Sequence, residues 1–225
     1  MKLLNQNSLS TTLDNLNQLF FDNVPIPVSE KKSVAKWIAG RQGLPGSYWK
    51  MFAPTASDFK GIKLFTGEFV NTRAGLSHIL GEESCRALNT LGVNETMESV
   101  EAAQKGLQSA IKHCREVGYE SYGYYCCGKC TAAYWRNLSS GEGQNRILLK
   151  AGMKHLKSSR DSKGKWKRFP FYYTLYSLIE IDLPEAREEL KYAAPVCERL
   201  VRTMHKDGKY ARRRYKLVQR VLEMV

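Results

Sequence analysis

Apolar residues recur every three or four positions along most of this chain, which is the spacing typical of amphipathic helices. We find no alternating run of apolar and polar residues long enough to predict a useful strand. The segments predicted to be helical after the first third of the chain are 72–80, 82–91, 98–117, 131–138, 146–158, 173–181, 185–206 and 213–223. The pattern therefore predicts an all-α protein.

The first third of the chain is less regular. Residues 1–23 are polar and rich in Asn, with a weak helical stripe, and the prolines in 24–27 require an extended backbone. A short helix follows and ends near Gly40 or Gly43, before a connection over 42–67 that is rich in Gly, Pro and Ser. We therefore predict an N-terminal segment over 1–33 and a helical-repeat domain over 34–225.

Short stretches of sequence recur in one order at a spacing near 42 residues. The segment 111–114 resembles 153–156 at a shift of 42, and 164–166 resembles 208–210 at a shift of 44. Between them, at a shift of 43, the trio Thr131, Trp135 and Leu138 corresponds to Thr174, Leu178 and Ile181. The predicted repeat is a helix, a loop containing Gly, and a second helix that Thr opens.

Such a helix pair cannot bury its apolar stripe alone, so neighbouring pairs must stack to complete a core. The period suits repeats of the HEAT type and also helical toroids. The alternative is chance similarity among ordinary amphipathic helices.

One stretch carries a resemblance to a known superfamily. Lys163-Gly164-Lys165-Trp166, followed by residues 169–178, resembles the repeat of the terpenoid cyclase and protein prenyltransferase superfamily. The segment 130–135 is similar to the cysteine-bearing inner helix of the prenyltransferase β-subunit. The resemblance covers residues 105–225 well and 34–91 weakly, and it implies repeated helix pairs that form a partial or closed α/α toroid.

The same resemblance implies where a catalytic zinc would lie. Protein prenyltransferases hold zinc with an Asp, a Cys and a His, and the Cys corresponds to Cys130. The Asp corresponds to Gly128 and the His to Tyr173, so two of the three ligands are not retained. The basic residues that bind diphosphate and the Asp-rich motif of triterpene cyclases are also missing. The resemblance therefore implies a fold, and leaves open whether the protein is an enzyme.

Three cysteines lie close together in the sequence, at Cys126, Cys127 and Cys130. The last two form a Cys-x-x-Cys pair, whose thiolates suit a soft metal ion such as zinc. The pair could instead be redox-active, since a helix that begins near Thr131 would lower a thiol pKa. The third interpretation is that these cysteines are small apolar packing residues.

The chain is strongly basic, with a net charge of +13 and a pI of about 9.5. This balance favours polyanionic or phosphorylated partners. The repeat predicts that two basic runs lie on equivalent loops at one rim, where Trp166, Tyr210 and Phe169 would stack on bases. The predicted anion-binding residues are Lys165, Arg168, Lys209, Arg212, Arg213 and Arg214. The alternative is a solvated surface with no dedicated partner.

Aromatic residues are frequent on the candidate inner helices and could line a cavity for an apolar or cationic ligand. The predicted ligand-binding residues are Tyr134, Trp135, Trp166, Tyr172, Tyr173 and Tyr176. The alternative is that these rings pack in the core.

The N-terminus has no apolar run typical of a signal peptide, and no run of about 18 apolar residues predicts a membrane span. We therefore expect a cytoplasmic protein with reduced thiols. Three hypotheses follow for its function. The first is a helical-repeat domain that binds an apolar or phosphorylated small molecule or partner through an aromatic face and basic rim. The second is a nucleic-acid-binding protein, and the third is a metal-dependent, prenyltransferase-like enzyme with a cysteine-based site.

Overall fold

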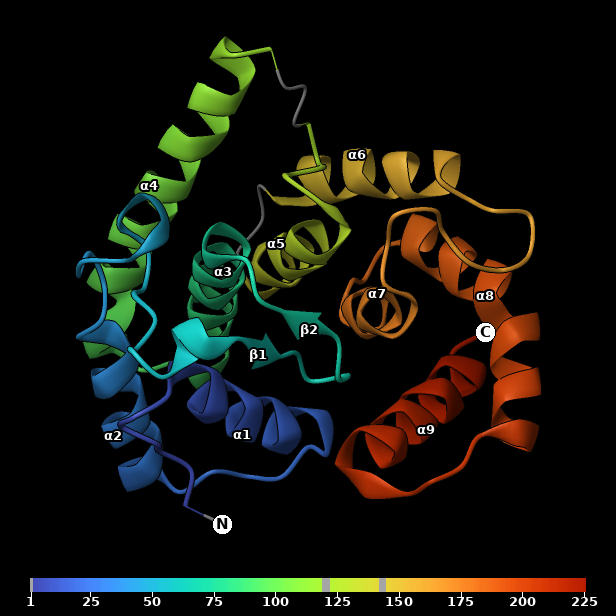
Figure 1. Ribbon diagram of the computed structural model, residues 1–225, viewed down its shortest axis with the longest axis horizontal. Coiled ribbons are helices and arrows are strands. Elements are labelled where there is room, and N and C mark those ends of the chain that lie inside the picture. The colour runs from blue at the N-terminus through green and yellow to red at the C-terminus, as the bar shows by residue number, and fades with distance from the viewer. Residues whose placement is uncertain (1, 119–121, 142–144) are drawn as a thin grey trace. The chain divides into compact units, whose positions relative to one another are not determined.

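Helices form most of the chain in the computed structural model, which describes residues 2–118, 122–141 and 145–225. The α-helices of these residues are α1 (Leu9–Phe21), α2 (Val28–Ala39), α3 (Arg73–Leu91), α4 (Met97–Glu116), α5 (Gly128–Ser140), α6 (Asn145–Ser158), α7 (Phe171–Leu178), α8 (Pro184–Thr203) and α9 (Gly208–Glu223) (Figure 1). Among the described residues, strands are limited to β1 (Ile62–Lys63) and β2 (Phe69–Val70), which pair antiparallel. The predicted all-α class is confirmed.

The chain divides into two units. Unit 1 contains residues 1–64 and 69–120, and unit 2 contains 65–68 and 121–225. The boundary expected at residue 33 does not coincide with this division, because α1 and α2 both pack against α3 inside unit 1. In the described part of the chain, none of the helices is both long enough and apolar enough to span a bilayer.

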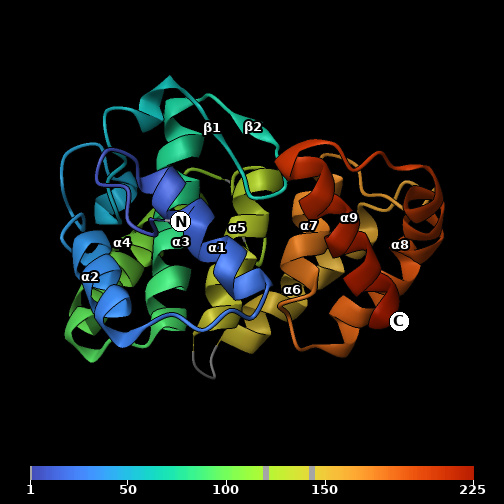
Figure 2. The ribbon, with the colours of Figure 1, turned by 90° about the horizontal axis from the view of Figure 1, so that it is seen from below.

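Unit 1 is organised around α3, which contacts α1, α2 and α4 and is buried along most of its length (Figure 2). The start of α1 is held by Asp58, a buried residue of the 3-10 turn at Asp58–Lys60. Its carboxylate accepts hydrogen bonds from the backbone N–H groups of Leu9 at 3.0 Å and Ser10 at 3.2 Å. These bonds satisfy amides that the helix itself leaves without acceptors.

Unit 2 is a two-layer stack of helix pairs. The outer helices α6 and α8 contact each other, while α7 contacts both α5 and α9 in the inner layer (Figure 1). Helices that follow each other in the sequence also pack together: α5 contacts α6, α7 contacts α8, and α8 contacts α9. The amphipathic outer helices bury one stripe each, whereas nearly every residue of α5 and α7 is buried.

The predicted repeat is in phase between α5 and α7 and out of phase at α9. Thr131 and Thr174 are each the fourth residue of their helix and are both fully buried. Gly164 lies in the loop before α7, but Gly208 is already the first residue of α9. The prediction that 164–166 and 208–210 occupy equivalent loops is therefore wrong.

Candidate functional site

The three clustered cysteines lie at the beginning of α5, in a turn that the backbone holds firmly. Cys127 occupies the N-cap position, and the preceding Cys126 has a left-handed backbone with φ of 66°. The Thr131 hydroxyl accepts a hydrogen bond from the Tyr125 amide at 3.1 Å and donates to the Tyr125 carbonyl at 2.9 Å. The turn therefore places the three thiols side by side through local contacts.

The thiols converge on the sulfur of Cys127. The Sγ atoms of Cys126 and Cys130 lie within 4.8 Å of each other. Both thiols act as hydrogen-bond donors to Cys127, and this lowers the Cys127 pKa well below its ordinary value. The same donor role, together with burial, raises the pKa of Cys130. Cys130 is buried while Cys126 and Cys127 are exposed, so solvent reaches one side of the cluster.

The loop between α6 and α7 covers the start of α5. A Cβ atom added to Gly128 would lie 2.2 Å from the carbonyl oxygen of Arg168 and 2.8 Å from the Cα of Phe169. Those neighbours are backbone atoms, so a side chain at Gly128 would displace the loop. Glycine at this position therefore lets the α6–α7 loop lie close to the cysteine cluster.

Tyr124 and His155 provide an aromatic wall beside the cluster. Their ring centroids are 4.3 Å apart, and Phe169 lies edge-on to Tyr124 at 6.1 Å. Burial, and then the negative charge of Cys127, raise the pKa of Tyr124. Burial lowers the pKa of His155, which favours its neutral imidazole. The cluster therefore borders two aromatic side chains that carry polar atoms and favour their uncharged forms.

This arrangement suits two kinds of chemistry. Three sulfur donors at one point are the ligands that zinc and other soft ions prefer, and a set of three leaves a fourth position for another donor. A stabilised thiolate beside a Cys-x-x-Cys partner is also a competent nucleophile. The predicted metal residues Cys126, Cys127 and Cys130 are thus brought together, and their occupation by zinc stays a prediction.

The other two positions that the prenyltransferase resemblance implies contribute no metal ligand. Gly128 has no side chain, and Tyr173 is 1% exposed within α7. The backbone N–H of Tyr173 donates to the Glu68 carboxylate at 3.2 Å, so this part of α7 is held by a capping contact. A metal centre at the cysteine cluster therefore lacks the Asp and the His that the resemblance places at positions 128 and 173.

The predicted aromatic ligand residues are mostly part of the core. Those at or below 4% exposure are Tyr134, Trp135, Trp166, Tyr173 and Tyr176, while Tyr172 is partly exposed. The Trp166 indole donates to the Glu189 carboxylate at 2.8 Å, and the Trp135 indole donates to the Gly123 carbonyl at 2.7 Å. Their role in ligand binding stays a prediction. The prediction that Trp166 and Phe169 stack on bases is wrong, because they are only 4% and 7% exposed. For Tyr210, which is partly exposed, it stays a prediction.

The predicted anion-binding residues separate into two groups. Arg213 donates to the Phe65 carbonyl at 3.1 Å, and Arg214 donates to the Thr66 carbonyl at 2.6 Å, so both hold the segment 65–68. Arg213 is also only 5% exposed, which leaves it poorly placed to meet a large anion. The other four predicted residues are exposed, namely Lys165, Arg168, Lys209 and Arg212.

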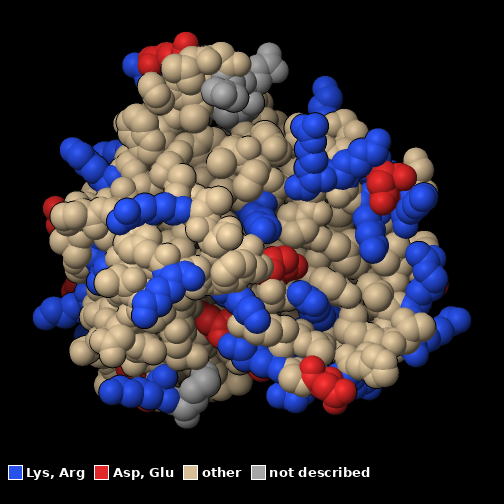
Figure 3. Space-filling model, viewed as in Figure 1, with Lys and Arg blue, Asp and Glu red and all other residues tan. Residues whose placement is uncertain are grey.

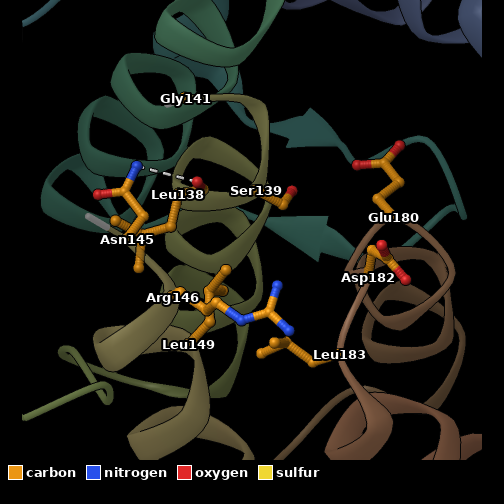
Figure 4. A pocket seen from close by; sticks show the side chains of 9 residues that line it. All are labelled: Leu138, Ser139, Gly141, Asn145, Arg146, Leu149, Glu180, Asp182 and Leu183. Carbon is orange, nitrogen blue, oxygen red and sulfur yellow. Dashed lines mark hydrogen bonds between the residues drawn. The ribbon is translucent and has the colours of Figure 1, made fainter. Parts of the chain in front are cut away.

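A pocket of about 260 Å³ lies elsewhere in unit 2, between α5, α6 and the α7–α8 connection. Figure 4 shows Arg146 extending from α6 toward this connection, which supplies the carboxylates of Glu180 and Asp182. Glu180 already receives two hydrogen bonds from the buried Arg136, at 2.9 and 3.1 Å. Arg136 therefore neutralises much of the negative charge that lines the pocket, and we assign the pocket no ligand.

The sequence interpretation missed a buried polar pair in unit 1. His78 Nε2 lies 3.0 Å from Glu82 Oε1 on α3, and both side chains are at most 1% exposed. Tyr48 stacks on the His78 ring with a centroid distance of 4.5 Å. The spacing of four residues was the only signal in the sequence, and it is common on helices.

Comparison of the chain with models of protein families, with curated proteins and with solved structures found no match.

Proposed function

We propose that this chain is a helical-repeat metal-binding protein that holds one zinc ion with the thiolates of Cys126, Cys127 and Cys130. The observation that carries the proposal is that the Sγ atoms of Cys126 and Cys130 lie within 4.8 Å of each other at the start of α5, with both thiols hydrogen-bonded to Cys127. Cys127 already favours its thiolate, and zinc would displace the protons that the other two thiols donate toward it.

The contacts around the cluster favour a bound ion over plain packing. A packing cysteine is buried, as Cys197 is on α8, where burial raises its pKa to about 12. Cys126 and Cys127 are exposed instead, and their turn is fixed by the Thr131 hydroxyl. Because these exposed sulfur atoms are already held in one geometry, they lose less conformational entropy when a metal binds.

We also propose that the helix pairs are arranged as in an α/α toroid. The support comes from unit 2, where α6 and α8 form an outer layer over α5, α7 and α9. The matching phase of Thr131 and Thr174 supports a shared repeat. The expected aromatic-lined ligand site belongs to this proposal and is not needed for the metal centre.

The proposal is tested by measuring zinc in the full-length protein, purified under reducing conditions, and its affinity in competition with a chelator. We expect about one zinc ion per chain. Cys127→Ala and Cys130→Ala should each weaken zinc binding at least about 10-fold, because each removes a direct ligand.

The matched control is Cys197→Ala, which makes the same change at a buried cysteine on another helix and should bind zinc like the wild type. The proposal is contradicted if the reduced wild-type protein takes up no zinc, or if Cys197→Ala loses as much affinity as Cys127→Ala.

A further inference from the structure

The positive charge of the chain is concentrated in one of its two units. Unit 2 contains 22 Lys and Arg residues against 11 Asp and Glu, a net charge of +11, out of +13 for the whole chain. Unit 1 contains 13 basic residues against 11 acidic ones. The field that attracts a polyanion therefore originates from unit 2.

Within unit 2, the loop between α6 and α7 presents cations at its surface. Lys163, Lys165, Lys167 and Arg168 are all exposed. Throughout the described ranges, none of these four forms an ion pair with a carboxylate. Lys and Arg also predominate over α6, α8 and this loop on the face shown in Figure 3. These cations are therefore available to an external anion.

The one acid among these cations, Asp161, serves to shape the loop. Its carboxylate accepts hydrogen bonds from the backbone amides of Lys163 and Lys165 at 2.8 and 2.9 Å, and from the Tyr192 hydroxyl at 3.1 Å. The two amides, that of Lys165 first, lower the Asp161 pKa. The Asp161 carboxylate thus binds backbone amides, and the side chains of Lys163 and Lys165 stay exposed to solvent.

Contacts with α8 hold the same loop in place. The Trp166 indole donates to Glu189 at 2.8 Å, and Arg160 pairs with the same carboxylate at 2.8 Å. The Gly164 amide donates to the Tyr192 hydroxyl at 3.1 Å. A loop that is ordered before binding loses less conformational entropy when a ligand arrives.

We propose that the α6–α7 loop binds the phosphate backbone of double-stranded nucleic acid. Lysines recognise phosphate through charge, and a backbone offers evenly repeated phosphates. The rings of Trp166 and Phe169 are buried, so the loop offers no platform for the unpaired bases of a single strand. The exposed large apolar residues of the described chain all lie outside 154–168, which disfavours insertion into a lipid surface. The inference is independent of the zinc proposal.

The test measures fluorescence anisotropy of a labelled random-sequence duplex at several salt concentrations. The variant is Lys163→Gln, Lys165→Gln and Lys167→Gln combined. The control is Lys36→Gln, Lys60→Gln and Lys105→Gln, which removes the same charge from exposed positions of unit 1. Circular dichroism verifies that both variants are folded, and the pair Lys165→Gln/Lys167→Gln serves as a milder second variant.

We expect the wild type to bind the duplex with an affinity that falls steeply with salt. Each lost phosphate contact lowers the slope of log K against log salt by about 0.9, so the triple loop variant should lose up to about 2.7 from the slope and at least about 10-fold in affinity at low salt. The control variant should retain most of the wild-type salt slope and most of the wild-type affinity at low salt. The inference is overturned if the wild type does not bind at low salt, if control and loop variants lose affinity equally, or if a single strand or anionic vesicles bind more tightly than the duplex.

Discussion

At the scale of single residues, Cys127 lies where several influences favour its thiolate. Two neighbouring thiols donate hydrogen bonds to its sulfur, and the amides of Cys130 and Lys129 at the start of α5 also lower its pKa. Cys126 and Cys127 are adjacent and both exposed, and Cys130 meets them one helical turn later. The Cys-x-x-C spacing predicted this meeting, whereas the direction of the pKa change depends on which thiol donates.

The lowered pKa predicts an unusual pH dependence for alkylation of the metal-free protein by iodoacetamide. An ordinary thiol with a pKa of about 8.5 reacts about tenfold faster for each unit of pH below that value. Because the folded-state pKa of Cys127 is depressed, its thiolate persists as the pH falls, and its rate should be nearly flat between about pH 5 and 8. Mass spectrometry of the modified peptides gives the rate at each cysteine. An alkylation rate at Cys127 that rises tenfold per pH unit over this range would show that the thiolate is not stabilised.

At the scale of elements, the positions of most helices follow from the sequence, and the exceptions have physical causes. The segment 146–158 was predicted as a helix, and α6 begins one residue earlier. Gly81 lies between two predicted helices, but in the structure it is an interior residue of α3. A Cβ atom at this position would lie 3.0 Å from the Met51 side chain, so the glycine allows Met51 to pack closely against α3. Periodicity cannot distinguish a glycine that ends a helix from one that admits a neighbour.

An ion pair joins α5 to the connection between α7 and α8, and it predicts a specific loss of stability. Arg136 is fully buried and donates to Glu180, which is 20% exposed, while its guanidinium lies 3.9 Å from the Tyr176 ring centroid. Arg136→Met should lower the free energy of unfolding by about 3 kcal/mol, because it removes the buried guanidinium that donates two hydrogen bonds to the Glu180 carboxylate. Urea unfolding monitored by circular dichroism gives this value.

The double variant Arg136→Met/Glu180→Met provides the control. It removes both charges and keeps apolar volume, so it should recover most of the lost stability. If the double variant is as unstable as Arg136→Met, the arginine acts through packing on Tyr176, and the ion pair is not the cause.

At the scale of the whole molecule, the division into two units was not predictable from local patterns. The periodicity of apolar residues reports which face of a helix is buried, but it does not identify the helix that covers it. The segment 65–68 shows this clearly, since it follows β1 in the sequence yet belongs to unit 2, where Arg213 and Arg214 bind its carbonyl groups. The net charge was predictable from composition, whereas its concentration in unit 2 required the boundary between units.

The central claim is that three sulfur atoms of the cysteine cluster bind one metal ion. X-ray absorption spectroscopy of the zinc-loaded, full-length protein tests it most directly, because the zinc edge reports the type and number of neighbouring atoms. We predict a shell of three sulfur atoms at about 2.3 Å, reduced to two in Cys126→Ala. A shell made only of nitrogen and oxygen, or a sulfur count that does not change in Cys126→Ala, would contradict the claim.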